Sequence, residues 1–449
     1  MHRFTLPIAL RAYGRVFRDA GRQAWLVGGA VRDMLLGKKV SDWDVATDAP
    51  AAEVFSMFPR VIRTGIRHGT VTVLWRGLSI ETTTFRTDGD YGDGRRPDSV
   101  TYTADIREDL RRRDFTINSI AYNIDTGELL DPHQGRADLG SAVVRAIGDP
   151  AERFAEDGLR SLRAVRFASQ LGFRIDGSTL EAIPRALDTF RKVSVERVRD
   201  ELVKILLSPR PSLGLELLSE TGLLPEILPE LSDGRGVEQK GFHRFDVMRH
   251  SFLSCDGASA RIELRLAALL HDIGKPATRS EGLDGQPTFH RHEEESALRT
   301  EEALRRLRFP NAVIAAVTHL VRNHMFSYDA SWSDAAVRRF LVRTGPENLE
   351  DLLSLRMADA YGTTGLRPDP RSMEPLRSRA EKLLKHSQAL SVRDLAVGGE
   401  ELASLGVPRG PVMGRILAEL LETVLDDPEL NTPDRLLDIA SRIKGKHGA

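Results

Sequence analysis

Residues 24–45 read AWLVGGAVRDMLLGKKVSDWDV, and they carry more structural information than any other stretch of the chain. The apolar start predicts a short buried strand, Gly28 and Gly29 predict a tight turn, and residues 30–36 predict a short helix. Backbone N–H groups at such a turn attract anions, and Arg32 adds a full positive charge. The element therefore favours a phosphate-binding turn, with a plain packing turn as the alternative.

Two carboxylates follow in the segment SDWDV at residues 41–45. Alternate residues of an extended chain share a face, so Asp42 and Asp44 are expected to project together while Trp43 packs on the other side. Neighbouring carboxylates repel each other unless a cation joins them, and hard oxygen ligands favour Mg2+, which also binds phosphate oxygens. We therefore expect a Mg2+ site here, with a solvated acidic turn as the alternative.

Five further motifs follow along the chain. They are IETTTFR at 80–86, RRDFTIN at 112–118, DPHQGRADL at 131–139, AEDGLRSLRAVRF at 155–167 and RVRDELVKILL at 197–207. Together with VGGAVRD at 27–33 and SDWDVAT at 41–47, this ordered set resembles the class II branch of the tRNA nucleotidyltransferase and bacterial poly(A) polymerase superfamily. Seven motifs in the family's order are a specific signal.

The order of strand-like and helix-like segments predicts the fold class. Segments rich in β-formers lie at 71–75, 78–85 and 117–124, and the pattern after residue 150 is helical. We therefore expect an α+β fold, in which a nucleotidyltransferase head with a mixed β-sheet precedes all-α regions. The expected domains are a catalytic head at 1–147, a helical neck that selects the nucleotide and binds RNA at 148–235, an HD domain at 236–365 and a C-terminal helical tRNA-binding region at 366–449.

Residues 87–99, TDGDYGDGRRPDS, are too rich in glycine and aspartate to pack, so they predict a mobile loop. In the resembling family a loop here helps the enzyme pass from adding C to adding A, and members that add only CC lack it. Its presence argues against a CC-only enzyme, and an ordinary surface insertion is the alternative.

The motif at 155–167 suggests how C and A are selected without a nucleic-acid template. On a helix, Asp157 and Arg160 lie three residues apart on one face. Cytosine and adenine each present an amino donor beside a ring-nitrogen acceptor, which a carboxylate and a guanidinium complement, whereas uracil and guanine present the opposite order. The resemblance implies that Arg163 and Arg166 contact the triphosphate. A solvated helix face with weak ion pairs is the alternative.

Three more residues are assigned by their place in the motifs. By resemblance Arg113 contacts the nucleotide, and Asp114 is suited to accept a hydrogen bond from a ribose hydroxyl. The alternation in residues 115–118 predicts a strand. Glu81 is either a third carboxylate that polarises the incoming 3'-hydroxyl or an ordinary strand-edge residue.

The motifs and the resemblance together predict template-independent addition of CCA to the 3' end of tRNA from CTP and ATP. The tRNA hydroxyl attacks the α-phosphorus in line and pyrophosphate leaves, with Mg2+ on Asp42 and Asp44. An A-adding enzyme or a poly(A) polymerase would use the same head, so both remain alternatives. A noncatalytic RNA-binding module would leave the carboxylates and the phosphate turn unexplained.

A second chemical signature lies downstream, where seven of the 12 histidines fall between residues 243 and 324. Residues 263–270 predict an apolar helix that leads into His271 and Asp272. With His250 and Asp359, this pair resembles the HD phosphohydrolase pattern, whose imidazole and carboxylate ligands suit a second divalent metal. An inactive scaffold is the alternative. Further possible ligands, which are more often bystanders on helix surfaces, are His290, His292, His319 and His324.

Composition limits the class of protein. At 449 residues with a formal charge of -1, the chain suits several packed domains, and any RNA-binding surface must be local. A single cysteine, Cys255, excludes internal disulfides, and no apolar run approaches membrane-spanning length, so we expect a cytoplasmic protein with no membrane partner. The sequence does not indicate an oligomeric state.

Contacts to tRNA are expected at two places. Residues 191–210 carry six basic and three acidic side chains, which suits a helix beside an acceptor stem. Residues 395–425 resemble the C-terminal segment of longer bacterial tRNA nucleotidyltransferases, which helps to hold the tRNA. Apolar residues at Leu417, Leu420, Leu421 and Val424 are more simply core.

Overall fold

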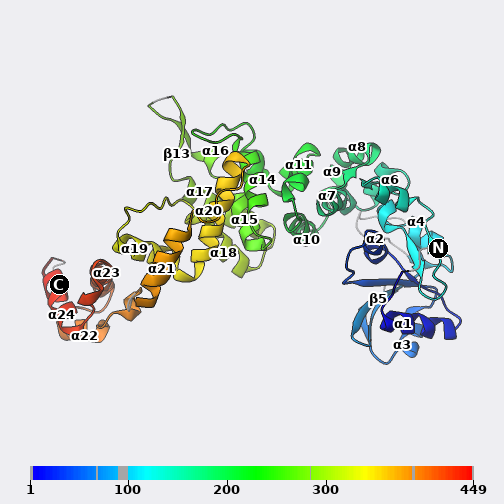
Figure 1. The fold of residues 1–449 in the computed structure, drawn as a ribbon, viewed down its shortest axis with the longest axis horizontal. Coiled ribbons are helices and arrows are strands. Elements are labelled where there is room, and N and C mark those ends of the chain that lie inside the picture. The colour runs from blue at the N-terminus through cyan, green and yellow to red at the C-terminus, as the bar shows by residue number, and fades with distance from the viewer. Residues whose placement is uncertain (1–3, 67–68, 89–99, 284, 387–389, 447–449) are drawn as a thin grey trace. The chain divides into compact units, whose positions relative to one another are not determined.

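The computed structural model describes residues 4–66, 69–88, 100–283, 285–386 and 390–446 (Figure 1). They form two compact units, Met1–Ser232 with Arg306–Arg308, and Asp233–Arg305 with Phe309–Ala449. The loop expected at 87–99 lies outside the described residues from position 89 onward. The four domain ranges expected from the sequence stay predictions.

The first unit is built on a seven-stranded mixed sheet. Its strands are β1 (Ala24–Leu26), β2 (Trp43–Thr47), β3 (Val61–Gly65), β4 (Thr70–Trp75), β5 (Leu78–Thr84), β8 (Ala121–Asn123) and β9 (Leu129–Leu130). The strand order is β3-β4-β5-β2-β1-β8-β9, and only the β2 and β5 neighbours run parallel. A separate pair joins β6 (Arg86–Asp88) to β7 (Val100–Tyr102). The expected mixed sheet is confirmed.

The helices around this sheet are short. They are α1 (Ile8–Asp19), α2 (Gly29–Leu35), α3 (Ala51–Met57), α4 (Ile106–Arg111) and α5 (Gly135–Gly140). Figure 1 shows α1 and α3 together on one side of the sheet, where Tyr13, Phe17, Phe58 and Trp75 form an aromatic cluster. The Tyr13 hydroxyl also bonds to Thr82 of β5 at 2.6 Å. Burial of these rings fixes α1 against the sheet.

Strand register places two carboxylates side by side. In β2, Trp43 and Val45 are buried while Asp44 between them is partly exposed, as the alternation predicted. Asp44 pairs in register with Glu81 on the parallel strand β5. Paired residues on neighbouring strands project from the same face, so the two side chains share one face of the sheet. Asp42 lies just before β2 and is exposed.

Helices make up most of the rest of the first unit. They are α6 (Pro150–Glu156), α7 (Leu159–Leu171), α8 (Gly177–Arg185), α9 (Leu187–Phe190), α10 (Val195–Leu206), α11 (Pro211–Glu220), α12 (Leu223–Ile227) and α13 (Pro229–Ser232). The central helix α7 packs against α10 and α11, and most of its residues are buried. This burial fixes the side chains that α7 presents to the head.

The second unit contains helices and one small strand pair. They are α14 (Val247–Gly257), α15 (Ile262–Leu270), α16 (Lys275–Thr278), β12 (Arg279–Glu281), β13 (Pro287–Phe289), α17 (His292–Arg306), α18 (Asn311–Arg322), α19 (Asp334–Thr344), α20 (Leu349–Thr364), α21 (Glu374–His386), α22 (Gly399–Ser404), α23 (Pro411–Asp426) and α24 (Pro433–Lys446). The last three helices share a hydrophobic core that includes Leu420, Leu421 and Val424, as expected. Each helix within the described ranges is too short or too polar to cross a lipid bilayer.

One expectation about secondary structure is wrong. Residues 115–118 do not form a strand, because Thr116–Asn118 form a 3-10 turn. The Asp114 side chain accepts hydrogen bonds from the Phe115 N–H and the Asn118 amide, which closes the backbone into a turn despite the alternating pattern. The chain after residue 150 is mainly helical, as expected. The short strands there are β11 (Arg174–Ile175), which pairs with β10 (Val143–Val144), and β12, which pairs with β13.

The packing of α1 gives a stability prediction. A Cβ on Gly14 would lie 2.4 Å from Ile124 Cγ2, so Gly14→Ala must push α1 away from the chain after β8. We expect a loss of about 1–3 kcal/mol in the free energy of unfolding of the first unit, measured by urea denaturation. Gly177→Ala, at the start of α8 with no atom within 4 Å of its Cβ, is the matched control and should change little. Equal effects of the two substitutions would contradict the close contact.

Candidate functional site

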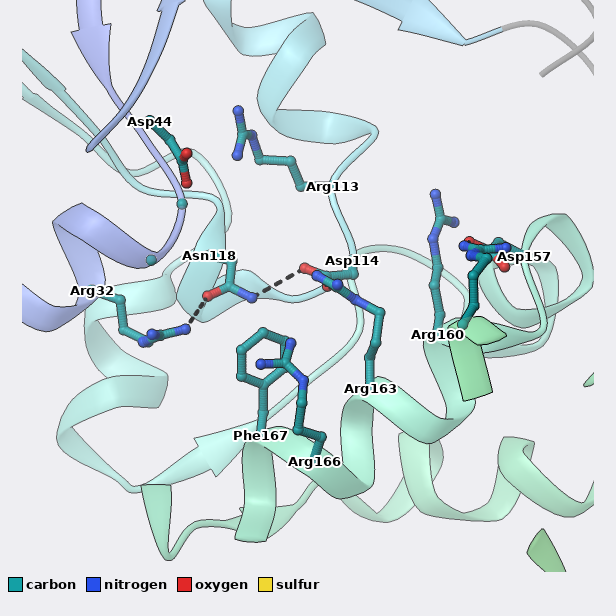
Figure 2. Close-up of a pocket in the computed structure, with 13 residues that line it drawn as sticks. Arg32, Asp44, Arg113, Asp114, Asn118, Asp157, Arg160, Arg163, Arg166 and Phe167 are labelled. Atoms are coloured by element: carbon teal, nitrogen blue, oxygen red, sulfur yellow. Dashed lines mark hydrogen bonds and ion pairs between the residues drawn. The ribbon is translucent and has the colours of Figure 1, made fainter. Parts of the chain in front are cut away.

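A cavity of about 410 Å³ in the first unit gathers most of the residues singled out in the head and in α7 (Figure 2). Its lining consists of Gly28, Gly29, Arg32, Asp44, Arg113, Asp114, Asn118, Asp157, Arg160, Arg163, Arg166, Phe167 and Arg197. Ten residues that the sequence placed at a nucleotide or Mg2+ site, Asp114 among them, are therefore together. Asp42 and Glu81, which the sequence also placed there, are not part of this lining.

The turn after β1 needs glycine at its first position. Gly28 has a φ of 66°, in the left-handed region, and a Cβ there would lie 3.3 Å from Arg113 Nη1 and 3.5 Å from Asp44 Oδ2. The Val27 N–H donates to the Asp44 carbonyl oxygen at 3.0 Å, which holds β1 and β2 together at this point. The glycine thus lets the backbone approach a carboxylate and a guanidinium at once.

Asp44 and Glu81 sit in an unfavourable electrostatic environment. Burial raises the pKa of Asp44, the nearby Arg113 lowers it, and Asp42 raises it again. Burial also raises the pKa of Glu81, and the charge of Asp44 adds to this increase. Both carboxylates line a second cavity of about 250 Å³, which shares Asp44 and Arg113 with the larger one. A cation beside them would stabilise their charged forms.

A chain of hydrogen bonds crosses the floor of the larger cavity (Figure 2). Arg32 Nη1 donates to Asn118 Oδ1 at 2.9 Å, and Asn118 Nδ2 donates to Asp114 Oδ1 at 3.1 Å. Arg163 donates to Asp114 Oδ2 from Nε at 2.8 Å and from Nη2 at 2.5 Å. One aspartate therefore connects α2, the turn after α4 and α7.

Asp114 is fully engaged by these donors. Burial would raise its pKa, but the charge of Arg163 and four hydrogen bonds bring the pKa down to about 2. An ionised carboxylate offers about four acceptor positions, and the Phe115 N–H, Asn118 and Arg163 occupy them. The predicted bond to a ribose hydroxyl would have to displace one of these donors, so that role stays a prediction.

Arg113 is held by a residue that the sequence analysis missed. Asp109, on α4, is fully buried, and its Oδ2 accepts from Arg113 Nη2 at 3.1 Å while its Oδ1 accepts from Arg112. Asp109 lies three and four residues before these arginines, a spacing typical of ion pairs within a helix. This spacing in the sequence could have identified Asp109 as the partner of Arg112 and Arg113.

Asp157 and Arg160 line the same cavity, but not as neighbours on one helical face. α7 begins at Leu159, and Asp157 precedes it in extended conformation, where its Oδ1 accepts from the Leu159 N–H at 3.0 Å. Arg160 donates instead to Glu156 and to the Arg153 carbonyl oxygen. The expected i, i+3 geometry is wrong because the backbone is extended at Asp157, which separates α6 from α7.

Gly158 is required by close packing. A Cβ there would lie 2.6 Å from the Phe190 nitrogen, so α9 passes directly against this position. This contact fixes the place at which α7 starts, and with it the positions of Asp157 and Arg160.

Arg166, Phe167 and Arg197 complete the lining. The guanidinium of Arg166 stacks 3.7 Å from the centre of the Phe167 ring and pairs with the buried Glu201. Burial lowers the pKa of Arg166 to about 10, although Glu201 opposes this decrease. Arg197 Nη2 donates to Asp157 Oδ2 at 2.7 Å, so a residue expected to face tRNA lines the cavity instead.

The second unit brings the four expected HD residues together. His250 Nε2 lies 3.3 Å from Asp272 Oδ2 and 3.3 Å from Asp359 Oδ1, and His271 Nε2 lies 3.2 Å from Asp272 Oδ2. His250, His271 and Asp272 are buried, and the Asp359 side chain is 14% exposed. Imidazole and carboxylate atoms at these distances fit a divalent metal ion.

The remaining candidate histidines separate into two groups. His292 and His324 are buried and lie beside Asp272. His319 faces the Thr344 carbonyl oxygen at 2.6 Å, and His290 is exposed. Helical periodicity does not separate the two groups, because it gives no information about which helices lie close to Asp272 in the fold.

Three family models match the chain. They describe the poly A polymerase head domain at residues 24–145, the probable RNA and SrmB-binding site of polymerase A at 172–234, and the HD domain at 243–364. The first covers the sheet with its glycine turn, and the third covers the histidine cluster. These matches agree with the resemblance drawn from the motifs.

Relatives match over nearly the whole chain. The CCA-adding enzyme of Levilactobacillus brevis is 37% identical over 409 residues, which cover 90% of each chain, and that of Geobacillus stearothermophilus is 34% identical over 427 residues, which cover 93% of each. A crystal structure of the Bacillus stearothermophilus CCA-adding enzyme in complex with CTP has a TM-score of 0.75 at 30% identity and covers 99% of this chain and 100% of that one. Identity above one third across nine tenths of both chains shows that this chain belongs to the family of CCA-adding tRNA nucleotidyltransferases.

Proposed function

We propose that this chain adds the nucleotides C, C and A to the 3' end of tRNA without a nucleic-acid template, using CTP and ATP and releasing pyrophosphate. The cavity of the first unit carries the proposal, because it joins a carboxylate at a sheet edge, a group of arginines and an Asp–Arg pair. These parts match the three needs of the reaction, which are activation of a hydroxyl, binding of a triphosphate and selection of a base. The related enzymes, one of them with bound CTP, support the same activity.

The triphosphate is assigned to the arginine side of the cavity. Six arginines and three aspartates line the cavity, so its surface carries an excess of positive charge. Asp114 holds Arg163 and Asp109 holds Arg113, so both guanidinium groups are in place before substrate binds. Guanidinium groups pair with phosphate oxygens through two parallel hydrogen bonds. The proposed phosphate ligands are Gly28, Gly29, Arg32, Arg113, Arg163 and Arg166.

Base selection is assigned to Asp157 and Arg160. The carboxylate would accept from the exocyclic amino group of C or A, and the guanidinium would donate to the adjacent ring nitrogen. Arg197 donates to Asp157, and Glu156 accepts from Arg160, so both side chains are held in place. They therefore cannot exchange positions to match uracil or guanine, whose donor and acceptor stand in the reverse order. Such a base would leave charged groups without partners.

Asp42 and Asp44 would hold Mg2+, with Glu81 as a third carboxylate. Burial and neighbouring negative charge raise the pKa values of Asp44 and Glu81, which is the environment that a cation makes favourable. Oxygen ligands of this kind suit Mg2+. When bound, Mg2+ would lower the pKa of the attacking hydroxyl and neutralise charge on the phosphates.

The 3' end of tRNA is assigned to the smaller cavity, because it shares Asp44 and Arg113 with the larger one. A hydroxyl in one cavity and a triphosphate in the other would both reach the same carboxylate. Residues 191–210 and the C-terminal helices are proposed to contact the tRNA backbone, and the cytoplasm is the proposed location. Within residues 191–210, Lys204 already pairs with Glu201. This stretch therefore offers less positive charge to tRNA than its composition suggested.

A second candidate activity is hydrolysis of a phosphate ester in the second unit. The buried cluster of His250, His271, Asp272 and Asp359 favours it, because these ligands suit a divalent metal that activates water. A bound divalent metal ion is the first requirement for this activity.

Product length tests the proposed function directly. We expect tRNA that lacks CCA to gain two nucleotides with CTP alone and three with CTP and ATP, and then to stop, as read on sequencing gels. Extension only from tRNA that ends in CC would instead indicate an A-adding enzyme. Continued addition of A would indicate a poly(A) polymerase.

The role of Asp44 is tested by Asp44→Asn. Because the substitution removes a charged ligand of the proposed Mg2+, we expect nucleotide addition to fall by more than about 100-fold, the upper end of the effect of losing an outer-sphere partner. The control is Asp19→Asn, which removes the same charge from a side chain that is 68% exposed and pairs with Arg18. Near wild-type addition by Asp44→Asn would remove Asp44 from the mechanism.

The role of Asp157 is tested by Asp157→Asn, whose amide donates as well as accepts. We expect the ratio of kcat/KM for CTP over UTP to fall by about 10- to 200-fold, measured on tRNA that lacks CCA. Glu152→Gln, an exposed position on α6, makes the same chemical change away from the cavity and should leave this ratio unchanged. An unchanged ratio in Asp157→Asn would assign base selection to other residues.

A further inference from the structure

We propose that Phe167 is a positioning residue for the triphosphate of CTP and ATP. Its aromatic ring holds the guanidinium groups of Arg32, Arg163 and Arg166 together, so that three positive charges form one binding surface for phosphate oxygens. The inference rests on the proposed function, because these arginines are the ligands assigned there to the triphosphate. It gives a role in substrate binding to a side chain that has no charge and no hydrogen-bonding group.

The three guanidinium groups lie around a single ring. The central carbon of the Arg166 guanidinium is 3.7 Å from the centre of the Phe167 ring, that of Arg32 is 5.3 Å away and that of Arg163 is 5.5 Å away. Figure 2 shows the ring among these groups. A cation within about 6 Å of a ring centre is attracted by the negative charge of the ring face. All three contacts fall within that range.

The ring itself is fixed by the core of the first unit. Phe167 is 4% exposed, and its ring meets the ring of Phe115 at 78°, with 5.6 Å between the two centres. Phe115 is fully buried. Phe167 also lies four residues after Arg163 on α7, so these two side chains are neighbours on the helix surface. The ring is therefore a rigid support that is in place before a nucleotide binds.

The three arginines need a shared partner because they come from two helices and carry like charges. Arg32 lies on α2, whereas Arg163 and Arg166 lie on α7. Repulsion between like charges is strongest where burial excludes water, and burial lowers the pKa of Arg166 to about 10. Phe167 is the side chain that the guanidinium groups of both helices contact. Its attraction for each cation offsets part of their mutual repulsion.

An aromatic face suits this place better than a further carboxylate. A carboxylate would neutralise positive charge that a triphosphate requires, and it would occupy N–H donors of the guanidinium groups. A ring attracts the cation through its face, which leaves the N–H donors at the edge of the guanidinium plane for phosphate oxygens. The alternative is a plain core side chain, whose contribution would come from its size and apolarity alone.

The test changes the charge of the ring face and keeps its shape. The full-length protein is made with mono-, di- or trifluorinated phenylalanine in place of Phe167, because each fluorine withdraws negative charge from the face and adds little volume. Isothermal titration calorimetry with Mg2+ and without tRNA then gives the Kd for CTP. We expect this Kd to rise with each added fluorine, to about 2- to 30-fold above the wild-type value with three.

The matched control is trifluorinated phenylalanine in place of Phe154, which is buried on α6 and is not part of the cavity lining. This change should leave the Kd for CTP as it is in the wild type. ATP and inorganic triphosphate serve as further probes with the Phe167 series. Both should lose affinity by the same factor as CTP, because the ring acts on the ligands of the phosphates and not on those of the base.

Circular dichroism and urea denaturation establish that each variant is folded. A Kd that does not depend on the number of fluorines, an equal rise with the Phe154 control, or a loss of affinity confined to CTP would overturn the inference. None of these outcomes would affect the proposed function, because the wild type would still bind CTP. A wild type that binds no CTP would instead overturn the proposed function, and the inference with it.

Discussion

The nucleotide-binding cavity depends on the hydrogen bonds that the ionised carboxylate of Asp114 accepts. This carboxylate is buried between the head and α7, and it accepts hydrogen bonds from Asn118 and Arg163. Asn118 in turn accepts from Arg32, so a single negative charge fixes side chains from three parts of the chain. A buried charge is tolerated only when it is fully paired, which means that the partners also have one favourable arrangement. The cavity is thereby shaped before any ligand enters it.

The same principle applies to the other arginines around the cavity. Asp109 holds Arg113, Glu201 pairs with Arg166, and Asp157 accepts from Arg197. Guanidinium groups this close together would repel one another, and each is stabilised by a carboxylate that stands behind it or beside it. The result is a positive surface that needs little rearrangement when a polyanion binds. Preorganised charge of this kind lowers a reaction barrier more than buried ion pairs raise the free energy of unfolding.

Most residues of this cavity could be predicted from the sequence, whereas part of their local geometry could not. Gly28, Asp44 and the α7 arginines were found because turn chemistry, alternation in a strand and motif order depend on near neighbours along the chain. Asn118, Phe167 and Arg197 were missed, and Asp157 was placed on a helix that begins after it, because these features depend on tertiary contacts. The 3-10 turn at Thr116–Asn118 has the same origin, since the side chain of Asp114 overrides a strand-like pattern. Periodicity carries no information about such contacts.

The two candidate metal centres differ in a way that follows from what each would have to do. In the head, Asp44 and Glu81 supply oxygen atoms beside open cavities, and a triphosphate would bring further oxygens of its own. An incomplete protein ligand set is suited to an ion that arrives with its substrate and leaves with the product. In the second unit, Asp272 is surrounded by buried imidazoles whose backbone bonds fix their tautomers. A nearly complete ligand set would retain an ion without substrate, so burial and ligand type in the second unit suit a resident metal ion.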